Sequence, residues 1–163
     1  MKALVLLTAI AILGAAVSAF AATSTTSAPR ETVLYGHISS LKPKGNRFEL
    51  RFDPGWWLTG YAAQQAKLAD TGSKDVPNDY SIVEEGHRLL SYLVSASASV
   101  TVLTRHGTGS IPTTSITVAE LAQIVKGRNP KHRALTEPKA GFWIRVGSKY
   151  PGLVLALDQQ YQP

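Results

Sequence analysis

The segment Arg47-Phe48-Glu49-Leu50-Arg51-Phe52 decides the fold prediction for this chain. Phe48, Leu50 and Phe52 lie on one face of an extended backbone, and the charged residues between them lie on the other. Strict alternation of this kind is typical of a β-strand with one buried face. The preceding stretch Lys42-Pro43-Lys44-Gly45-Asn46 has the Gly and Asn of a tight turn. It predicts that residues 32–41 form a strand that pairs with this one as a hairpin.

Similar patterns predict five further strands, at residues 80–83, 88–95, 99–104, 142–146 and 153–157. Glu84-Glu85-Gly86-His87 predicts a hairpin turn between the first two, and Ser148-Lys149-Tyr150-Pro151-Gly152 predicts another between the last two. Gly36, inside the first strand, suits a bend or bulge. About seven short strands, mostly in adjacent hairpins, predict a mainly β (α+β) chain. We expect a small antiparallel barrel, OB-like or SH3-like in general shape, with two accessory helices.

The two helices have different start signals. Asp53-Pro54 predicts the start of the first helix, with Asp53 as the N-cap and proline at the first helical position. This helix would run to about Asp70, and we expect its Trp57 and Tyr61 to pack across the barrel mouth as part of the core. In the second helix, Thr117 and Glu120 have the spacing of a capping box.

The N-terminus predicts export. Lys2 is followed by a charge-free apolar run at residues 3–17, and Ala19-Phe20-Ala21 offers the small residues that a signal peptidase requires. We expect residues 1–21 to be a cleavable secretory signal, residues 22–31 a flexible Ser/Thr/Ala tether, and residues 32–163 a single domain outside the cytoplasm, secreted or periplasmic. An uncleaved membrane anchor is the alternative, because the stretch from Ala3 to Ala22 is about as long as the roughly 20 residues that cross a bilayer.

The amino-acid composition excludes several kinds of functional site. The chain has no cysteine and a net charge of +6, so disulfides, thiolate metal sites and thiol catalysis are excluded. We expect a monomer that needs no cofactor and binds no specific nucleic acid. After signal cleavage, we expect no association with a membrane. The basic residues gather in two turn-like clusters, which leaves weak binding of anionic polymers as one alternative function. The clusters are Lys42, Lys44 and Arg47, and Lys126, Arg128, Lys131 and Arg133.

No catalytic motif stands out in the sequence. The four histidines are scattered without metal-ligand spacing, and no Gly-x-Ser-x-Gly or Ser-x-x-Lys motif is present. The Gly-rich stretch 106–110 does not open a helix directly, so it does not predict a phosphate-binding loop. We therefore assign no catalytic or metal-binding residue and expect a non-enzymatic binding or envelope accessory module. An extracellular hydrolase that uses Asp53 or Asp79 is the second alternative.

Aromatic residues beside polar ones give the candidate ligand site. Trp56 falls on the side of the first predicted helix away from the core, and Asn78, Asp79 and Tyr80 lead into a predicted strand. Aromatic faces next to amide and carboxylate groups are the surfaces that sugar and peptide ligands use. These four residues therefore predict a site for a cell-envelope glycan or peptide. A structured turn at residues 78–80 is the competing interpretation.

Three motifs carry a resemblance to a known group of proteins. They are Phe52-Asp53-Pro54 with Trp57-Leu58-Thr59-Gly60, then Asn78-Asp79-Tyr80-Ser81-Ile82, then Gln159-Gln160-Tyr161-Gln162-Pro163. In this order they resemble a family of small exported bacterial proteins and lipoproteins. The resemblance implies export and one compact domain, gives Asp53 and Gly60 the roles of helix start and close packing, and implies no activity. The chain departs from the family in lacking a lipobox cysteine and in carrying the loop 104–115.

Overall fold

The computed structural model of the protein describes residues 31–84, 88–106, 111–137, 139–148 and 152–162. The predicted signal and almost all of the tether lie outside these ranges, as do most of the Gly-rich stretch 106–110 and the centres of the two turns at 85–87 and 149–151. None of the helices in the described part of the chain has the length and apolar character needed to span a bilayer.

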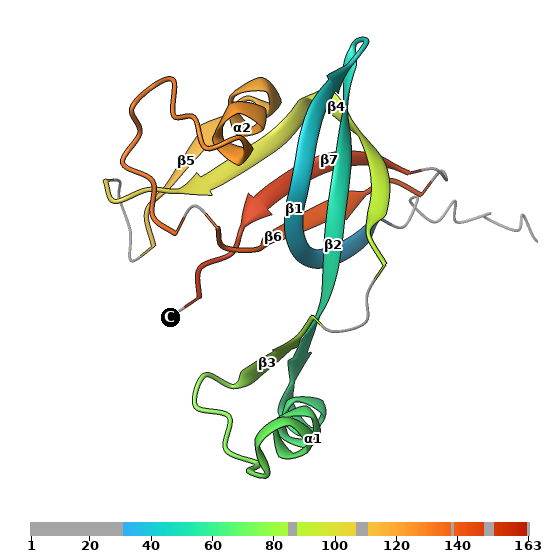
Figure 1. Ribbon diagram of the computed structural model, residues 1–163, viewed down its shortest axis with the longest axis vertical. Coiled ribbons are helices and arrows are strands. Elements are labelled where there is room, and N and C mark those ends of the chain that lie inside the picture. The colour runs from blue at the N-terminus through green and yellow to red at the C-terminus, as the bar shows by residue number, and fades with distance from the viewer. Residues whose placement is uncertain (1–30, 85–87, 107–110, 138, 149–151, 163) are drawn as a thin grey trace, which may run out of the picture.

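Five strands close a barrel, which confirms the predicted fold class (Figure 1). Around the barrel they follow the order β1 (Thr32–Lys44), β2 (Arg47–Thr59), β4 (Leu90–Leu103), β7 (Leu153–Gln159) and β6 (Phe142–Val146), which returns to β1. The other four pairs around the barrel are antiparallel, as predicted, and the β4–β7 pair is parallel, which the prediction did not include. A five-stranded barrel of this kind agrees with the expected OB-like general shape.

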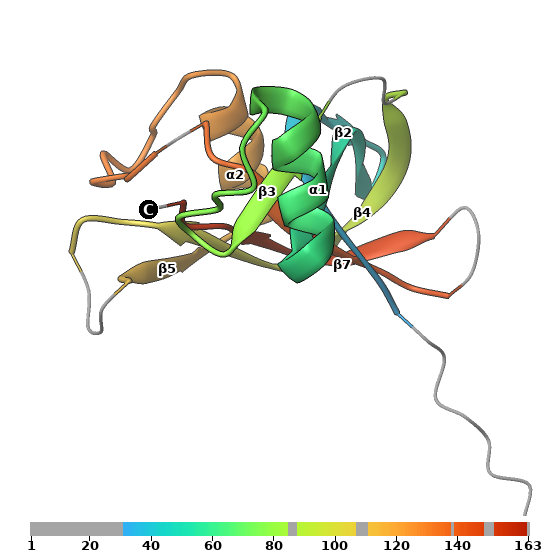
Figure 2. The same cartoon turned by 90° about the horizontal axis from the view of Figure 1, so that it is seen from below.

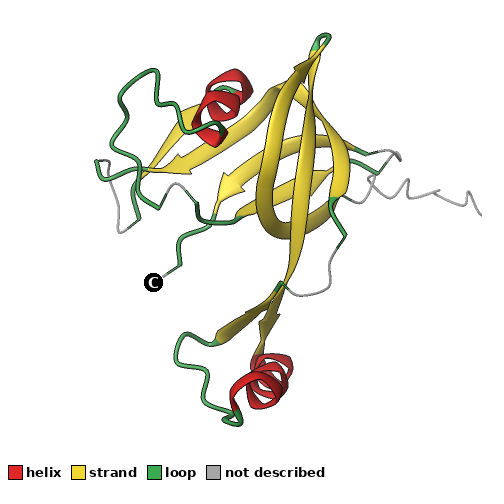
Figure 3. Ribbon diagram, viewed as in Figure 1, coloured by secondary structure: helices red, strands yellow, loops and turns green. Residues whose placement is uncertain are grey.

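Two further strands and two helices extend the barrel. β3 (Tyr80–Val83) pairs with the second half of β2, and β5 (Thr113–Ile116) pairs with the end of β4. Figures 1 and 3 show α1 (Gly60–Thr71) and β3 on an arm that projects away from the barrel. In Figure 2, which looks from below, this arm stands in front of the barrel. α2 (Val118–Val125) packs against β1 and β4.

The barrel interior is apolar and includes one face of α2. Alternation along β2 directs Leu50 and Phe52 inward, as the sequence predicts, and both are fully buried. Burial of such side chains contributes about 1.5–3 kcal/mol each. The predicted core position of Tyr61 is wrong, because this side chain on α1 is 74% exposed. The other members of the core are Leu41, Val94, Ala98, Val100, Val102, Ile116, Val118, Leu121, Ala122, Phe142, Ile144, Val146, Val154 and Leu157.

The predicted start of the first helix at Asp53-Pro54 is wrong. Both residues lie in β2, and α1 begins seven residues after Asp53, with Thr59 as an N-cap that makes no side-chain capping bond. The physical reason is the position of Pro54, where β2 changes partners. β2 pairs with β1 as far as Gly55 and with β3 from Trp56 onward. At such a switch point a proline, which has no N–H to donate, is tolerated in a strand.

Three strand predictions also need correction. Residues 80–83 and 88–95 do not form a hairpin with each other, because β3 pairs with the second half of β2 and β4 with its first half. The two strands expected at 88–95 and 99–104 are one continuous strand, β4. β5 lies at the end of the segment expected to be a loop. The predicted hairpin of β6 and β7 is confirmed.

Gly36 has a different role from the predicted bend. It lies opposite Pro54 in the β1–β2 ladder, and the register irregularity of that ladder comes later, between Ile38 and Ser40. A Cβ atom added at Gly36 would lie only 2.1 Å from the backbone oxygen of Asp53. The glycine therefore allows two backbones to approach closely at the point where β2 leaves the barrel.

Candidate functional site

An aromatic cluster lies on the outer face of the barrel. In β1, Leu34 points toward the core, and in β6 both neighbours of Trp143 do the same. Because successive side chains of a strand point to opposite faces, Tyr35 and Trp143 point outward. These two residues pair with each other across the two strands. Their ring centroids are 5.2 Å apart. Trp57 from β2 contacts Tyr35 edge-on at 5.0 Å and stacks on Tyr80 of β3 at 4.0 Å. Aromatic pairs in these geometries stabilise the fold by about 0.5–1.5 kcal/mol each, in addition to the free energy gained by burying the rings.

The segment after β7 covers this cluster with two glutamine side chains. The side-chain oxygen of Gln160 accepts a hydrogen bond from Trp143 Nε1 at 2.7 Å, and Gln162 Nε2 donates to the Tyr35 hydroxyl at 2.6 Å. Tyr35 is 2% exposed. Desolvation by burial raises the pKa of Tyr35 to about 12, with smaller contributions from Glu84 and Tyr80 and an opposing one from the Gln162 hydrogen bond. The hydroxyl is therefore held neutral and fixed in position.

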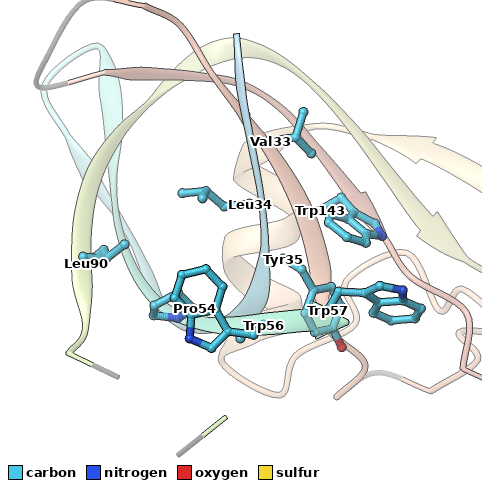
Figure 4. Close-up of a pocket in the computed structure, with 9 residues that line it drawn as sticks. Val33, Leu34, Tyr35, Pro54, Trp56, Trp57, Leu90 and Trp143 are labelled. Carbon is cyan, nitrogen blue, oxygen red and sulfur yellow. The ribbon is translucent and has the colours of Figure 1, made fainter. Parts of the chain in front are cut away.

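A hollow of about 340 Å³ opens beside the cluster, between the start of β1 and the start of β4. Figure 4 shows Leu90 and Trp143 on opposite sides of the opening and Trp56 at its edge. Trp56 is 62% exposed and presents a large apolar surface to solvent at this point. The complete lining is Val33, Leu34, Tyr35, Pro54, Gly55, Trp56, Trp57, Leu90 and Trp143.

Charged residues lie next to lining residues of this hollow without being part of the lining. A Cβ atom added at Gly55 would lie 3.6 Å from Glu84 Cγ, so the Glu84 side chain borders the wall. The Glu84 carboxylate also contacts His37 Nε2 of β1 at 2.6 Å. Exposed Arg145 of β6 lies directly opposite Val33 in the β1–β6 ladder. The site thus combines an apolar, aromatic wall with charged groups that could orient a ligand.

The structure separates the four predicted ligand residues. Trp56 lines the hollow, although it lies on a strand and not on a helix. Tyr80 supports the wall from behind by stacking on Trp57. Asn78 and Asp79 are exposed in the turn before β3, where Asp79 adopts a positive φ of 59° and its N–H donates to the Val76 carbonyl. The structured-turn interpretation therefore describes these two residues.

Sequence reasoning missed four residues of this site, namely Tyr35, Trp143, Gln160 and Gln162. For Trp143 a signal was present, because alternation with Phe142 and Ile144 places it on the outer face of β6. For Tyr35 and the glutamines no local signal exists. Their roles depend on the β1–β6 pairing and on the path of the chain after β7.

The predicted capping residues have three different outcomes. Asp53 lies within β2 opposite His37 and caps no helix. Thr117 is the N-cap of α2, and its Oγ1 accepts a hydrogen bond from the Glu120 N–H at 3.1 Å. The Glu120 side chain does not return to the N-cap, as a capping box would require. It is 4% exposed and binds Arg133 through both carboxylate oxygens and Lys131 at 3.0 Å.

The two basic clusters differ in how far they are neutralised. In the β1–β2 hairpin Lys44 contacts Glu49 at 2.6 Å, whereas Lys42 and Arg47 are exposed. In the second cluster, Lys131 and Arg133 hold the buried Glu120. The hydrogen bond from Arg133 is the largest cause of the lowered pKa of Glu120. Part of the second cluster thus has a structural role.

Comparison with known proteins yields no relative. No protein-family model, no curated protein and no solved structure matches this chain at a significant level. Functional inference therefore rests on the geometry of the site itself.

Proposed function

We propose that this protein is an exported, non-enzymatic binding module that holds a glycan of the cell envelope in the aromatic hollow. The observation that carries the proposal is Trp56, which is 62% exposed on the wall of a cavity of about 340 Å³. Large exposed apolar surface that borders a concave site is typical of ligand binding.

A sugar ring suits this hollow better than a fully apolar ligand. The C–H face of a pyranose can lie flat on the Trp56 indole, and Glu84 beside Gly55 and Arg145 opposite Val33 are the nearby charged groups for its hydroxyls. The cavity falls within the range of about 300–1,000 Å³ that is usual for small-ligand sites. Within the wall, the mutual contacts of the Tyr35, Trp57 and Trp143 rings keep the binding surface rigid, which lowers the entropic cost of binding.

Export and the family resemblance support the same proposal. Trp57, Tyr80 and Gln160 each belong to one of the three motifs that carry the resemblance, and all three contact the aromatic cluster. The hydrolase alternative has less support, because Asp53 and Asp79 lie on separate elements and neither lines the hollow.

Isothermal titration calorimetry with soluble peptidoglycan fragments and chitooligosaccharides tests the proposal. Saturable binding is expected, and Trp56→Ala should weaken it by at least about tenfold, as loss of a large aromatic contact does. Tyr61→Ala is the matched control, because it removes an even more exposed aromatic side chain on α1, away from the hollow. Absence of heat with every glycan, or equal losses in the two variants, would refute the glycan site. Binding of the peptide stem without sugar would identify a peptide ligand instead.

A further inference from the structure

A second hollow, of about 380 Å³, lies at the end of α2 and carries several cationic side chains. Its walls come from three segments, which are Arg105 two residues after β4, the C-terminal turn of α2, and the loop that follows α2 (orange in Figure 1). The lining residues are Arg105, Ile124, Gly127, Arg128, Asn129, Arg133, Ala134 and Leu135. No acidic side chain is among them.

The hollow has a rigid backbone frame. The Arg105 N–H donates to the Ala134 carbonyl at 2.7 Å, and the Arg128 N–H donates to the Gln123 carbonyl at 3.0 Å. The side chain of Asn129 bonds both the N–H and the carbonyl of Arg133, at 2.9 and 2.7 Å. The backbone at all three arginines of the hollow is therefore held in place by hydrogen bonds that do not depend on a ligand.

The charges in this region do not cancel. The buried carboxylate of Glu120 is satisfied by Arg133 and Lys131. Arg105 and Arg128 are exposed, and among the described residues no carboxylate forms an ion pair with either of them. Two exposed arginines without an ion pair among the described residues thus line one hollow, together with Arg133, whose guanidinium is fixed by Glu120.

We propose that this hollow binds a phosphate group, either as the free anion or as a phosphate ester. Guanidinium donors match the oxygens of phosphate in geometry, and several of them together suit a group of this charge density. The apolar floor of Ile124 and Leu135 can accommodate an aliphatic chain attached to the phosphate. The site shares no lining residue with the aromatic hollow, so it does not depend on the proposed glycan binding.

Nuclear magnetic resonance titration of the purified protein tests this site. The probes are inorganic phosphate and a short glycerol-phosphate oligomer, compared with sodium acetate at equal ionic strength. Both phosphate probes should shift the amide signals of Arg105, Gly127 and Arg128 in a saturable way. Tighter binding of the oligomer would identify an ester as the source of the phosphate, and equal affinity would identify the free anion. Both of these results support the site.

A double variant, Arg105→Gln with Arg128→Gln, removes the two uncompensated charges and leaves the Glu120–Arg133 pair intact. Its affinity for phosphate should fall by about tenfold or more. The matched control is Lys42→Gln with Arg47→Gln, which makes the same change of charge on the β1–β2 hairpin. Equal losses in the two double variants would show nonspecific attraction and overturn the proposal. Equal affinity for acetate, or no saturation with either phosphate probe, would also overturn it.

Discussion

Gly36→Ala should destabilise the barrel through a backbone collision. The added Cβ would lie 2.1 Å from the Asp53 carbonyl oxygen and 2.8 Å from Pro54 Cα, whereas ordinary contact begins at 3.4 Å. The colliding atoms belong to the backbone of the paired strand, so no side-chain rotation relieves the contact. β1 and β2 must separate by more than 1 Å where Gly36 pairs with Pro54.

The cost combines overpacking, about 1–3 kcal/mol, with weakened ladder hydrogen bonds at about 1 kcal/mol each. We expect a total of about 3 kcal/mol, which corresponds to a fall in melting temperature of about 10 °C for a domain of this size. Thermal unfolding followed by circular dichroism measures the change. Gly55→Ala is the matched control on the facing strand, because the atoms nearest to its Cβ would be side-chain atoms of Tyr35 and Glu84, at 3.4 Å or more. Equal melting temperatures for the two variants would refute the close approach of the strands.

Three other predictions concern caps and protonation. Thr117→Ala should cost about 1 kcal/mol in chemical denaturation, because the Glu120 N–H loses its acceptor. The Glu120 pKa is lowered in the folded protein, so its stabilising contribution is present above the unfolded value of about 4.3 and lost as the pH falls below it. Arg133→Ala should reduce this acid-dependent part of the stability, measured as unfolding free energy against pH. The pKa of Tyr35 is raised to about 12, so its contribution is complete below the unfolded value of about 10 and lost as the pH rises from there. Tyr35→Phe should remove that alkaline loss and one tyrosinate transition in ultraviolet absorbance; an unchanged alkaline profile would contradict the burial of the hydroxyl.

The sequence predicts the parts of the fold that depend on local alternation. Phe48, Leu50 and Phe52 define the inner face of β2, and the Gly45-Asn46 turn defines the β1–β2 hairpin, as the structure confirms. The parallel β4–β7 pair could not be predicted in this way, because it joins residues that are far apart in the chain.

The error at Asp53-Pro54 has a specific physical cause. The same dipeptide suits the first turn of a helix and a strand residue that needs no ladder hydrogen bond. Which of these forms depends on β3, whose pairing with Trp56 and Trp57 keeps the chain extended as far as Thr59. Tertiary pairing thus overrides the local helix signal.

The candidate site is less predictable than the fold. The sequence predicts that Trp56 faces away from the core, but only because it places Trp56 on a helix. The structure has a strand at this position. Four elements and the segment after β7 build the aromatic cluster, and the partners of Tyr35 lie up to 127 residues away from it in sequence. No pattern within a short window can report such a contact.

The hydrogen bond between Tyr35 and Gln162 also has a consequence for the order of folding. A chain that emerges from its N-terminus must add 127 more residues after Tyr35 before this hydroxyl meets its partner. Until then Gln162 cannot bond to Tyr35, and the rings of Tyr35, Trp57 and Trp143 remain exposed apolar surface. Such non-local closure slows folding and prolongs exposure to aggregation. We therefore expect a nascent chain of this protein to remain unfolded, or bound to a chaperone, until Gln162 has been synthesised.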